Sequence, residues 1–302
     1  MTATSDLPEV AEKVVKLRHP GRWVSYAVIA VLAAMLLDVL INNPNFGWDV
    51  VGEYFFSNRI LDGLLKTLQL TAIAMGVGIV LGVMLAIMRL SSNPVLSRVS
   101  WLYIWFFRGT PVFVQLLFWG YISILFPVIE IGIPFGPGFV LAETNTLITP
   151  VMAAILGLGL NEGAYMAEIV RAGISAVPKG QTEAAKALGM PGARILRRII
   201  LPQAMRVILP PTANNTISML KTTSLVSVLA FPELLYAAQL IYSTNFETIP
   251  LLLTASIWYI IVTSILTVGQ HYLERYYSKS DRLAGLSPMR RLAALQKRRG
   301  AK

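Results

Sequence analysis

The chain consists of long apolar stretches separated by shorter polar connections. Because a bilayer core of roughly 30 Å needs about 20 apolar residues in a helix, six segments qualify as membrane spans. They are approximately 23–41, 63–88, 99–128, 147–167, 207–229 and 250–272. The third is interrupted by Gly109-Thr110-Pro111, a sequence that should break its helix. This pattern predicts an all-α integral membrane protein with six transmembrane helices.

Basic residues are concentrated in every second connection, and this distribution predicts the orientation of the spans. Four of the 26 Lys and Arg lie in 1–22, two in 89–98, seven in 168–206 and nine in 274–302. The connections 129–146 and 230–249 contain none. Lys and Arg are retained in cytoplasmic loops, so both termini are expected in the cytoplasm. The predicted parts are a cytoplasmic N-terminal tail at 1–22, a transmembrane domain at 23–272 with a cytoplasmic loop at 168–206, and a basic cytoplasmic tail at 273–302.

The first apolar stretch is expected to stay in the protein as an anchor. It is longer than the 7–15 apolar residues of a signal peptide, and no small-residue cleavage site follows it.

Composition excludes several classes of function. The chain has 302 residues, of which 55% are hydrophobic and 14% are charged, whereas about a quarter of a soluble domain is charged. It has no cysteine and two histidines, which excludes thiolate chemistry and disfavours a metal site. The net charge of +10 follows the predicted cytoplasmic loops, so no nucleic-acid partner is expected.

Two runs of glycine lie inside predicted spans. Gly76, Gly78 and Gly82 form one run, and Gly157, Gly159 and Gly163 form the other. Both miss the dinucleotide-binding fingerprint by one residue. Small residues at this spacing let helices approach closely in lipid. The chain also lacks a G-x-x-x-x-G-K-[ST] loop, so any ATPase that drives this protein is expected to be another chain.

The long cytoplasmic loop has an internal pattern. Good helix formers at 181–188 predict a short helix that the Gly189–Gly192 cluster ends. A second short helix is expected at 193–200, before Pro202 turns the chain back to the membrane. An alanine-faced helix of this kind suits docking into another protein. The alternative is an amphipathic loop that lies on anionic headgroups through its arginines.

This loop resembles the signature of ATP-binding-cassette importer permeases, E-A-A-x3-G-x9-I-x-L-P, with every specified position filled from Glu183 to Pro202. Further segments in family order are similar to permeases for polar amino acids (the histidine, glutamine, glutamate and arginine group). They are FRGTPVFVQ at 107–115, AYMAEIVRAGI at 164–174, VPKGQTEAAKALGM at 177–190, LPQAMRVILPP at 201–211 and NNTISMLKTTSLVSV at 214–228. The resemblance covers about 61–277. Three features depart from it: Thr222 stands where the group commonly has Asp, the external stretch 129–146 is longer, and an additional first span precedes a five-span core.

The resemblance implies a multi-pass permease subunit of the bacterial plasma (inner) membrane that moves polar amino acids and is not an enzyme. Its partners would be an ATPase dimer docked on 175–200, a second permease copy or a paralogue, an extracytoplasmic amino-acid-binding protein and membrane lipid. ATP and Mg would lie on the ATPase, and this chain would hold no cofactor. The residues implied in coupling to the ATPase are Glu183, Ala184, Ala185, Gly189, Arg194 and Arg197.

Ionisable groups within spans normally face a cavity or each other. Glu162 and Lys221 are both deep in predicted spans and are expected to line the path, where they would contact the two ends of an amino acid. Glu168 and Arg171, spaced i,i+3, are expected to pair with each other. The complete set of candidates for the path is Arg108, Thr110, Gln115, Asn161, Glu162, Tyr165, Asn214, Asn215, Lys221 and Thr222.

Two other classes of function were weighed against an importer permease. A self-contained ion-coupled transporter would be supported by inverted repeats, which the two halves of the chain do not display. A membrane enzyme would need a convergent acid, base or metal cluster, and none is evident in the sequence.

Overall fold

The computed structural model describes residues 21–133 and 138–284, and the chain divides into two units, Met1–Gly47 and Trp48–Lys302. Most of the predicted tails, 1–20 and 285–302, lies outside the described residues. In the first unit α1 (Gly21–Asn42) matches the first predicted span and has no buried residue. A short 3-10 helix, η1 (Pro44–Phe46), follows it, and the Asn43 side chain caps η1 by accepting a hydrogen bond from the backbone of Asn45.

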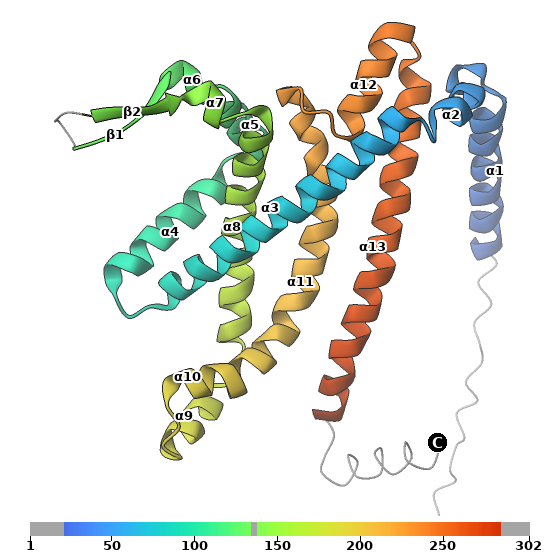
Figure 1. Ribbon diagram of the computed structural model, residues 1–302. Helices are drawn as coiled ribbons and strands as arrows, with labels where there is room; N and C mark the ends of the chain where they lie inside the picture. The colour runs from blue at the N-terminus through green and yellow to red at the C-terminus, as the bar shows by residue number, and fades with distance from the viewer. Residues whose placement is uncertain (1–20, 134–137, 285–302) are drawn as a thin grey trace, which may run out of the picture. The chain divides into compact units, whose positions relative to one another are not determined.

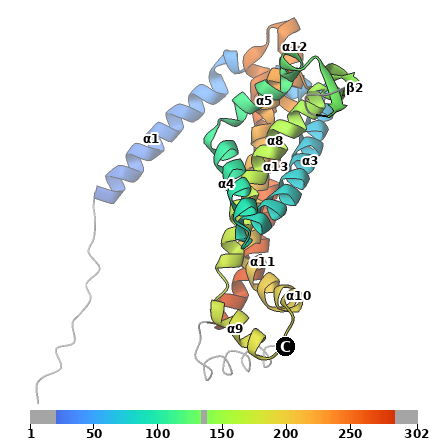
Figure 2. The same cartoon turned by 90° about the vertical axis from the view of Figure 1, so that its left-hand side faces the viewer.

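The second unit is a helical bundle, shown in two views in Figures 1 and 2. Its elements up to α8 are α2 (Trp48–Tyr54), α3 (Asn58–Leu90), α4 (Pro94–Gly109), α5 (Val112–Gly120), α6 (Ile122–Leu125), β1 (Val128–Gly132), β2 (Gly138–Glu143), α7 (Thr144–Leu147) and α8 (Pro150–Ser175). The remaining elements are α9 (Lys179–Ala187), α10 (Gly192–Ile195), the π-helical turn η2 (Leu196–Ile200), α11 (Leu201–Thr222), the 3-10 segment η3 (Thr223–Leu229), α12 (Leu234–Asn245) and α13 (Thr248–Ala284).

The predicted cytoplasmic loop 168–206 and the predicted external connections 129–146 and 230–249 lie at opposite ends of this bundle. In both views α9 and α10 are at one end, and α12 and β2 are at the other. The predicted cytoplasmic loop and the predicted external connections are therefore separated by the length of α8 and α11. This arrangement agrees with the orientation predicted for 129–146, 168–206 and 230–249, and the position of the termini stays a prediction.

The all-α class is confirmed, with one addition that the sequence pattern did not predict. The stretch 128–143 forms an antiparallel hairpin in which β1 pairs with β2, with an irregular register between Ile129 and Glu130. Its strands lie in the stretch that is longer than the family pattern.

Among the described residues, three helices are long and apolar enough to cross a membrane, or up to five if each of two bent helix pairs is one span. The bent pairs are α4 with α5, at 98°, and the helical segment Gly192–Leu229 with α12, at 45°. The helix α8 is not among these, because Asn161 and Glu162 interrupt its apolar sequence. The six spans stay a prediction.

Close packing of α3 against α8 organises the core of the unit. A Cβ atom added to Gly78 would lie 2.6 Å from the Cγ of Glu162, and one added to Gly159 would lie 2.9 Å from a methyl of Val77. Gly82 abuts Met166 in the same way, whereas Gly76 has nothing within 4 Å. The predicted role of the glycine runs is thus confirmed at these contacts, whereas at Gly76 no other helix of the described residues approaches. Because glycine has no side chain, the backbones of α3 and α8 come closer at these positions than larger residues would allow.

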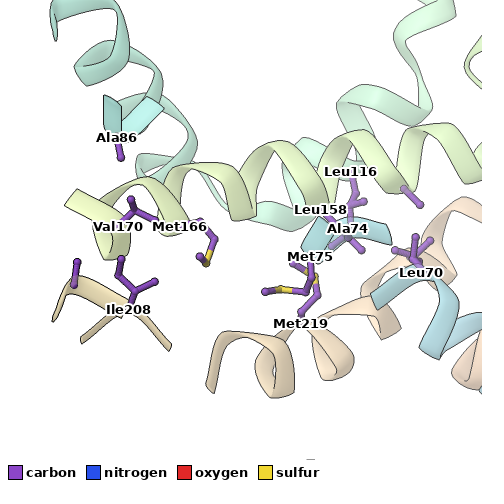
Figure 3. Close-up of a cluster of buried hydrophobic side chains, with 13 residues drawn as sticks. Leu70, Ala74, Met75, Ala86, Leu116, Leu158, Met166, Val170, Ile208 and Met219 are labelled. Carbon is purple, nitrogen blue, oxygen red and sulfur yellow. The ribbon is translucent and has the colours of Figure 1, made fainter. Parts of the chain in front are cut away.

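Apolar side chains from four helices fill the space beside this contact. Figure 3 shows Met75 of α3, Leu116 of α5, Leu158 of α8 and Met219 of α11 pointing toward one another. Leu116 and Leu158 are completely buried. The cluster fixes α5, α8 and α11 around a set of polar residues that includes Asn161, Glu162 and Asn215.

Candidate translocation path and coupling surface

The break between α4 and α5 is held open by side-chain hydrogen bonds. The chain leaves the helix at Thr110, as the sequence predicts, and this frees backbone carbonyls within the membrane domain. Gln115 Nε2 donates to the carbonyls of Phe107 (3.0 Å) and Thr110 (3.1 Å), and Asn161 Nδ2 donates to the same Phe107 carbonyl (2.9 Å). Gln115 Nε2 also lies 2.7 Å from the Thr110 hydroxyl, and its amide oxygen accepts from Asn161. Three of the path candidates therefore stabilise the break.

A cavity of about 320 Å³ lies between α5, α8 and α11. Its lining consists of Val112, Leu158, Asn161, Glu162, Tyr165, Asn215, Ser218, Met219 and Thr222. Glu162 is only 6% exposed, and one of its carboxylate oxygens accepts a hydrogen bond of 2.9 Å from Asn215 Nδ2. Because Cβ and Cγ of Glu162 pack against Gly78 and Asn215 holds its carboxylate, the carboxylate has a fixed position on the cavity wall.

A second cavity of about 590 Å³ lies between α3, α4 and α8. It is lined by Arg89, Trp101, Ile104, Trp105, Arg108, Gly109, Tyr165, Glu168 and Arg171. The guanidinium carbon of Arg108 lies 5.3 Å from the centroid of the Tyr165 ring, which is within the range of a cation–π contact. Tyr165 lines both cavities, so its ring is the wall that they share.

The predicted pairing of Glu168 with Arg171 is confirmed. Arg171 donates to Glu168 through both Nε and Nη2, and the shortest of these distances is 2.7 Å. Among residues 21–133 and 138–284, Glu168 and Arg171 form the one side-chain ion pair that is seen. Glu162 has no cationic partner in that part of the chain.

The structure does not bring Lys221 to Glu162. Lys221 is exposed and lines neither cavity, although its neighbour Thr222 lines the first. Asn214 is likewise exposed and outside both cavities, whereas Asn215 contacts Glu162 directly. The helical period explains the difference, because adjacent residues of α11 point about 100° apart.

Several lining residues were not among the sequence candidates. Trp101 and Trp105 are both exposed and their rings stack, with centroids 6.3 Å apart. They share one helix face with Arg108 at i, i+4 and i+7, and this spacing was the signal in the sequence. Arg89 and Ser218 also line the cavities and were not among the candidates.

Glu233 is a further buried carboxylate that sequence reasoning missed. It is completely buried at the N-cap of α12, where it accepts hydrogen bonds from the backbone of Leu235 and Tyr236. Its Oε2 also accepts from the hydroxyl of Tyr259 in α13 (2.9 Å) and lies 3.4 Å from the hydroxyl of Thr67 in α3. An acidic residue directly before an apolar helix was the available signal. Glu233 ties three helices together and lines neither cavity described above.

The predicted coupling loop, 168–206, forms the helix that its sequence predicts, and Gly189 ends it. Gly189 has φ +73°, in the left-handed region. Its N–H donates to the carbonyl of Lys186, and the N–H of Met190 donates to the carbonyl of Ala185. These two bonds form a Schellman motif. The glycine is therefore required by the backbone and not by lack of space, because an added Cβ would meet nothing within 4 Å.

The residues proposed for coupling differ in exposure. Ala185 is 3% exposed and packs inward. Five are open to solvent, namely Glu183, Ala184, Gly189, Arg194 and Arg197. Leu188, which was not predicted, is 82% exposed between them.

The second half of the loop corrects one expectation. Pro202 does not turn the chain, because the backbone stays helical from Gly192 through the π-helical turn into α11. Pro202 follows directly on the π-helical turn, where the N–H of Leu201 bonds to the carbonyl of Leu196 and the regular i→i−4 hydrogen-bond ladder is already interrupted. The predicted second helix at 193–200 is thus the beginning of one long helical segment.

Comparisons with known proteins match this architecture. Residues 78–279 match the family described as "Binding-protein-dependent transport system inner membrane component". The chain is 49% identical to an arginine transport system permease protein (ArgU) of Corynebacterium glutamicum, over 94% of this chain and 88% of that protein. It is 36% identical to a probable amino-acid ABC transporter permease protein (YckA) of Bacillus subtilis, over 75% of this chain and 96% of that protein.

A solved structure agrees with the sequence relatives. The crystal structure of an amino acid ABC transporter with histidines superposes with a TM-score of 0.61 at 36% identity, over 72% of this chain and 94% of that chain. Such permeases leave ATP hydrolysis to a separate ATPase and work with a second permease subunit. This favours the importer over an ion-coupled transporter and over a membrane enzyme. The chain therefore belongs to the family of binding-protein-dependent inner membrane components, as a multi-pass permease subunit of a bacterial ATP-binding-cassette importer.

Proposed function

We propose that this permease imports amino acids with a cationic side chain and that the cavity beside Glu162 receives the cationic group. The observation that carries the proposal is the state of Glu162. The residue is 6% exposed and lines a cavity, and its carboxylate forms no ion pair within the described part of the chain. A buried carboxylate without a counter-charge is costly in a membrane protein. A cationic cargo would remove that cost when it binds.

The polar groups around Glu162 fit a guanidinium or ammonium group. Asn161, Asn215, Ser218 and Thr222 supply oxygen atoms that can accept hydrogen bonds from N–H donors. The cavity of about 320 Å³ is at the lower limit for a small-molecule site, which suits one amino acid. The arginine transport system permease of C. glutamicum, 49% identical over most of the chain, supports a basic amino acid as the cargo.

The coupling surface is proposed as the dock for the ATPase, which would carry ATP and Mg. Ala184 and Leu188 are exposed on or next to α9, and Leu188 is 82% exposed. A small apolar surface flanked by Glu183 and the arginines of α10 and η2 suits a groove on a partner protein. The opposite end of the bundle, which bears β2 and α12, would receive cargo from an external binding protein.

The proposal is tested by cargo-stimulated ATP hydrolysis. The permease is purified with its ATPase, reconstituted without a binding protein, and assayed with each of the twenty amino acids. We expect arginine and lysine to stimulate hydrolysis and glutamate and aspartate to have no effect. Stimulation by acidic amino acids, or by neutral ones alone, would contradict the assignment of Glu162.

A further inference from the structure

The two cavities have opposite electrostatic character although they share one wall. Glu162 is the acidic residue of the first, whose lining includes no Lys or Arg. The second is lined by three arginines and one glutamate. Tyr165 lies between them, three residues after Glu162 on α8, so the two side chains are neighbours on one helix face. A cargo that lies across Tyr165 would meet a negative charge on one side and positive charge on the other.

The arginines of the second cavity are not equivalent. Arg171 is paired with Glu168, and Arg89 Nη1 donates to the hydroxyl of Ser97 (2.8 Å). Arg108 forms no ion pair within the described residues, and its charge rests over the ring of Tyr165. A cation–π contact is weaker than the bidentate hydrogen bonds that an arginine makes to a carboxylate. Arg108 is therefore the arginine that can exchange its present contact for a stronger one.

The position of Arg108 also suits contact with a cargo. It is in the last turn of α4, directly before the break that Gln115 and Asn161 hold open. Asn161 belongs both to that break and to the lining of the Glu162 cavity. The same short stretch of structure thus positions the guanidinium and the first cavity relative to each other.

From this arrangement we infer that Arg108 binds the carboxylate of the amino acid while Glu162 binds its cationic side chain. In the absence of cargo the guanidinium stays on Tyr165, and cargo draws it off the ring. This inference rests on the proposed function and adds the orientation of the cargo. It replaces Lys221, the residue expected from the sequence, because Lys221 lines neither cavity.

The test compares two probes that differ only in the carboxylate. L-Arginine has it, and agmatine is the same molecule without it. Equilibrium binding of both is measured on the purified permease–ATPase complex in phosphatidylcholine nanodiscs, without a binding protein, whose own selectivity would mask the result. We expect the wild-type complex to bind arginine at least tenfold more tightly than agmatine.

Three variants then separate the roles. Arg108→Gln should weaken arginine binding about tenfold or more and leave agmatine binding no weaker, so that the preference disappears. Arg108→Lys should keep part of the preference, because it retains the charge without the planar fork. Arg98→Gln changes an exposed arginine of the same helix that lines neither cavity, and it should match the wild type. If Arg108 had only a structural role, Arg108→Gln would weaken the binding of arginine and of agmatine by the same factor.

The outcomes distinguish the inference from the proposed function. If Glu162→Gln weakens both probes but Arg108→Gln leaves the preference for arginine intact, the carboxylate assignment is wrong and the cation site stands. If Lys221→Gln abolishes the preference instead, the sequence-based expectation is restored. If Arg108→Gln changes only the binding of anionic lipid added to the nanodiscs, the second cavity is a headgroup site. If the wild type binds neither probe, both proposals fail.

Discussion

Replacement of Gly189 tests whether the shape of the coupling helix depends on one backbone angle. Gly189 has φ +73° and ends α9 with two backbone hydrogen bonds, from its own N–H and from that of Met190. Since an added Cβ would meet nothing within 4 Å, substitution changes the conformational preference of this residue and creates no clash within the chain. The left-handed conformation costs an L-residue roughly 1–2 kcal/mol, and more if the side chain is β-branched.

That cost sets the expected order of a variant series. Asn tolerates this conformation best after glycine, so Gly189→Asn should stay close to the wild type. For Gly189→Ala, a cost of roughly 1–2 kcal/mol lowers the ratio of chains with the capped end of α9 to chains without it by about 5–30-fold. Gly189→Val should be the most affected. If the ATPase binds only permease in which α9 is capped, its apparent affinity falls in proportion to the capped fraction.

The assay is the ratio of ATP hydrolysed to cargo imported in proteoliposomes, together with binding of the ATPase to the permease. We expect uncoupling in the order Val, Ala, Asn, with the thermal stability of the membrane domain unchanged. If Gly189→Val couples normally, the capped helix is not the coupling element. If Gly189→Asn is as defective as Gly189→Val, contact with the partner and not backbone strain explains the glycine.

Three further predictions test topology and packing. In this chain without cysteine, Gly138→Cys should be labelled only from outside and Ala184→Cys only from the cytoplasm, and labelling of both from one side would refute the topology. Gly82→Val should lower the free energy of unfolding in detergent by about 1–3 kcal/mol, because the added side chain overpacks the contact with α8. Gly76→Val on the same helix should change that free energy by under about 0.5 kcal/mol. Equal effects of the two substitutions would contradict the packing. Glu233→Gln should destabilise the protein by about 1–3 kcal/mol, because one amide cannot replace all the bonds that the buried carboxylate accepts, and unchanged stability would show that the three-helix contact does not depend on it.

Features that depend on local sequence were predicted well. The helix break at Gly109–Pro111, the Glu168–Arg171 pair and the end of the coupling helix at Gly189 were all expected, because each follows from a few adjacent residues. The exception is Pro202, which was expected to turn the chain. A proline normally kinks or breaks a helix in its interior. Here a π-helical turn comes directly before Pro202 and the chain stays helical, which the sequence alone did not show.

Features that depend on which helices meet were predicted less well. The expectation that Glu162 and Lys221 line one path rested on their depth in the membrane, and depth does not determine which face of α11 is turned toward α8. Arg108 was a candidate, but its contact with Tyr165 depends on how α4 packs against α8. The burial of Glu233 required α3, α12 and α13 to converge on one point, which no single segment indicates.

The central claim is that Glu162 receives a cationic cargo, and ATP-dependent uptake of radiolabelled L-arginine by the reconstituted complex tests it most directly. The wild type is compared with Glu162→Gln, which keeps the size of the side chain and removes its charge, and both complexes are first shown to contain equal amounts of folded permease. We predict that Glu162→Gln loses most of the uptake while the complex still binds its ATPase. Uptake by Glu162→Gln at the wild-type rate and with the wild-type KM would contradict the account.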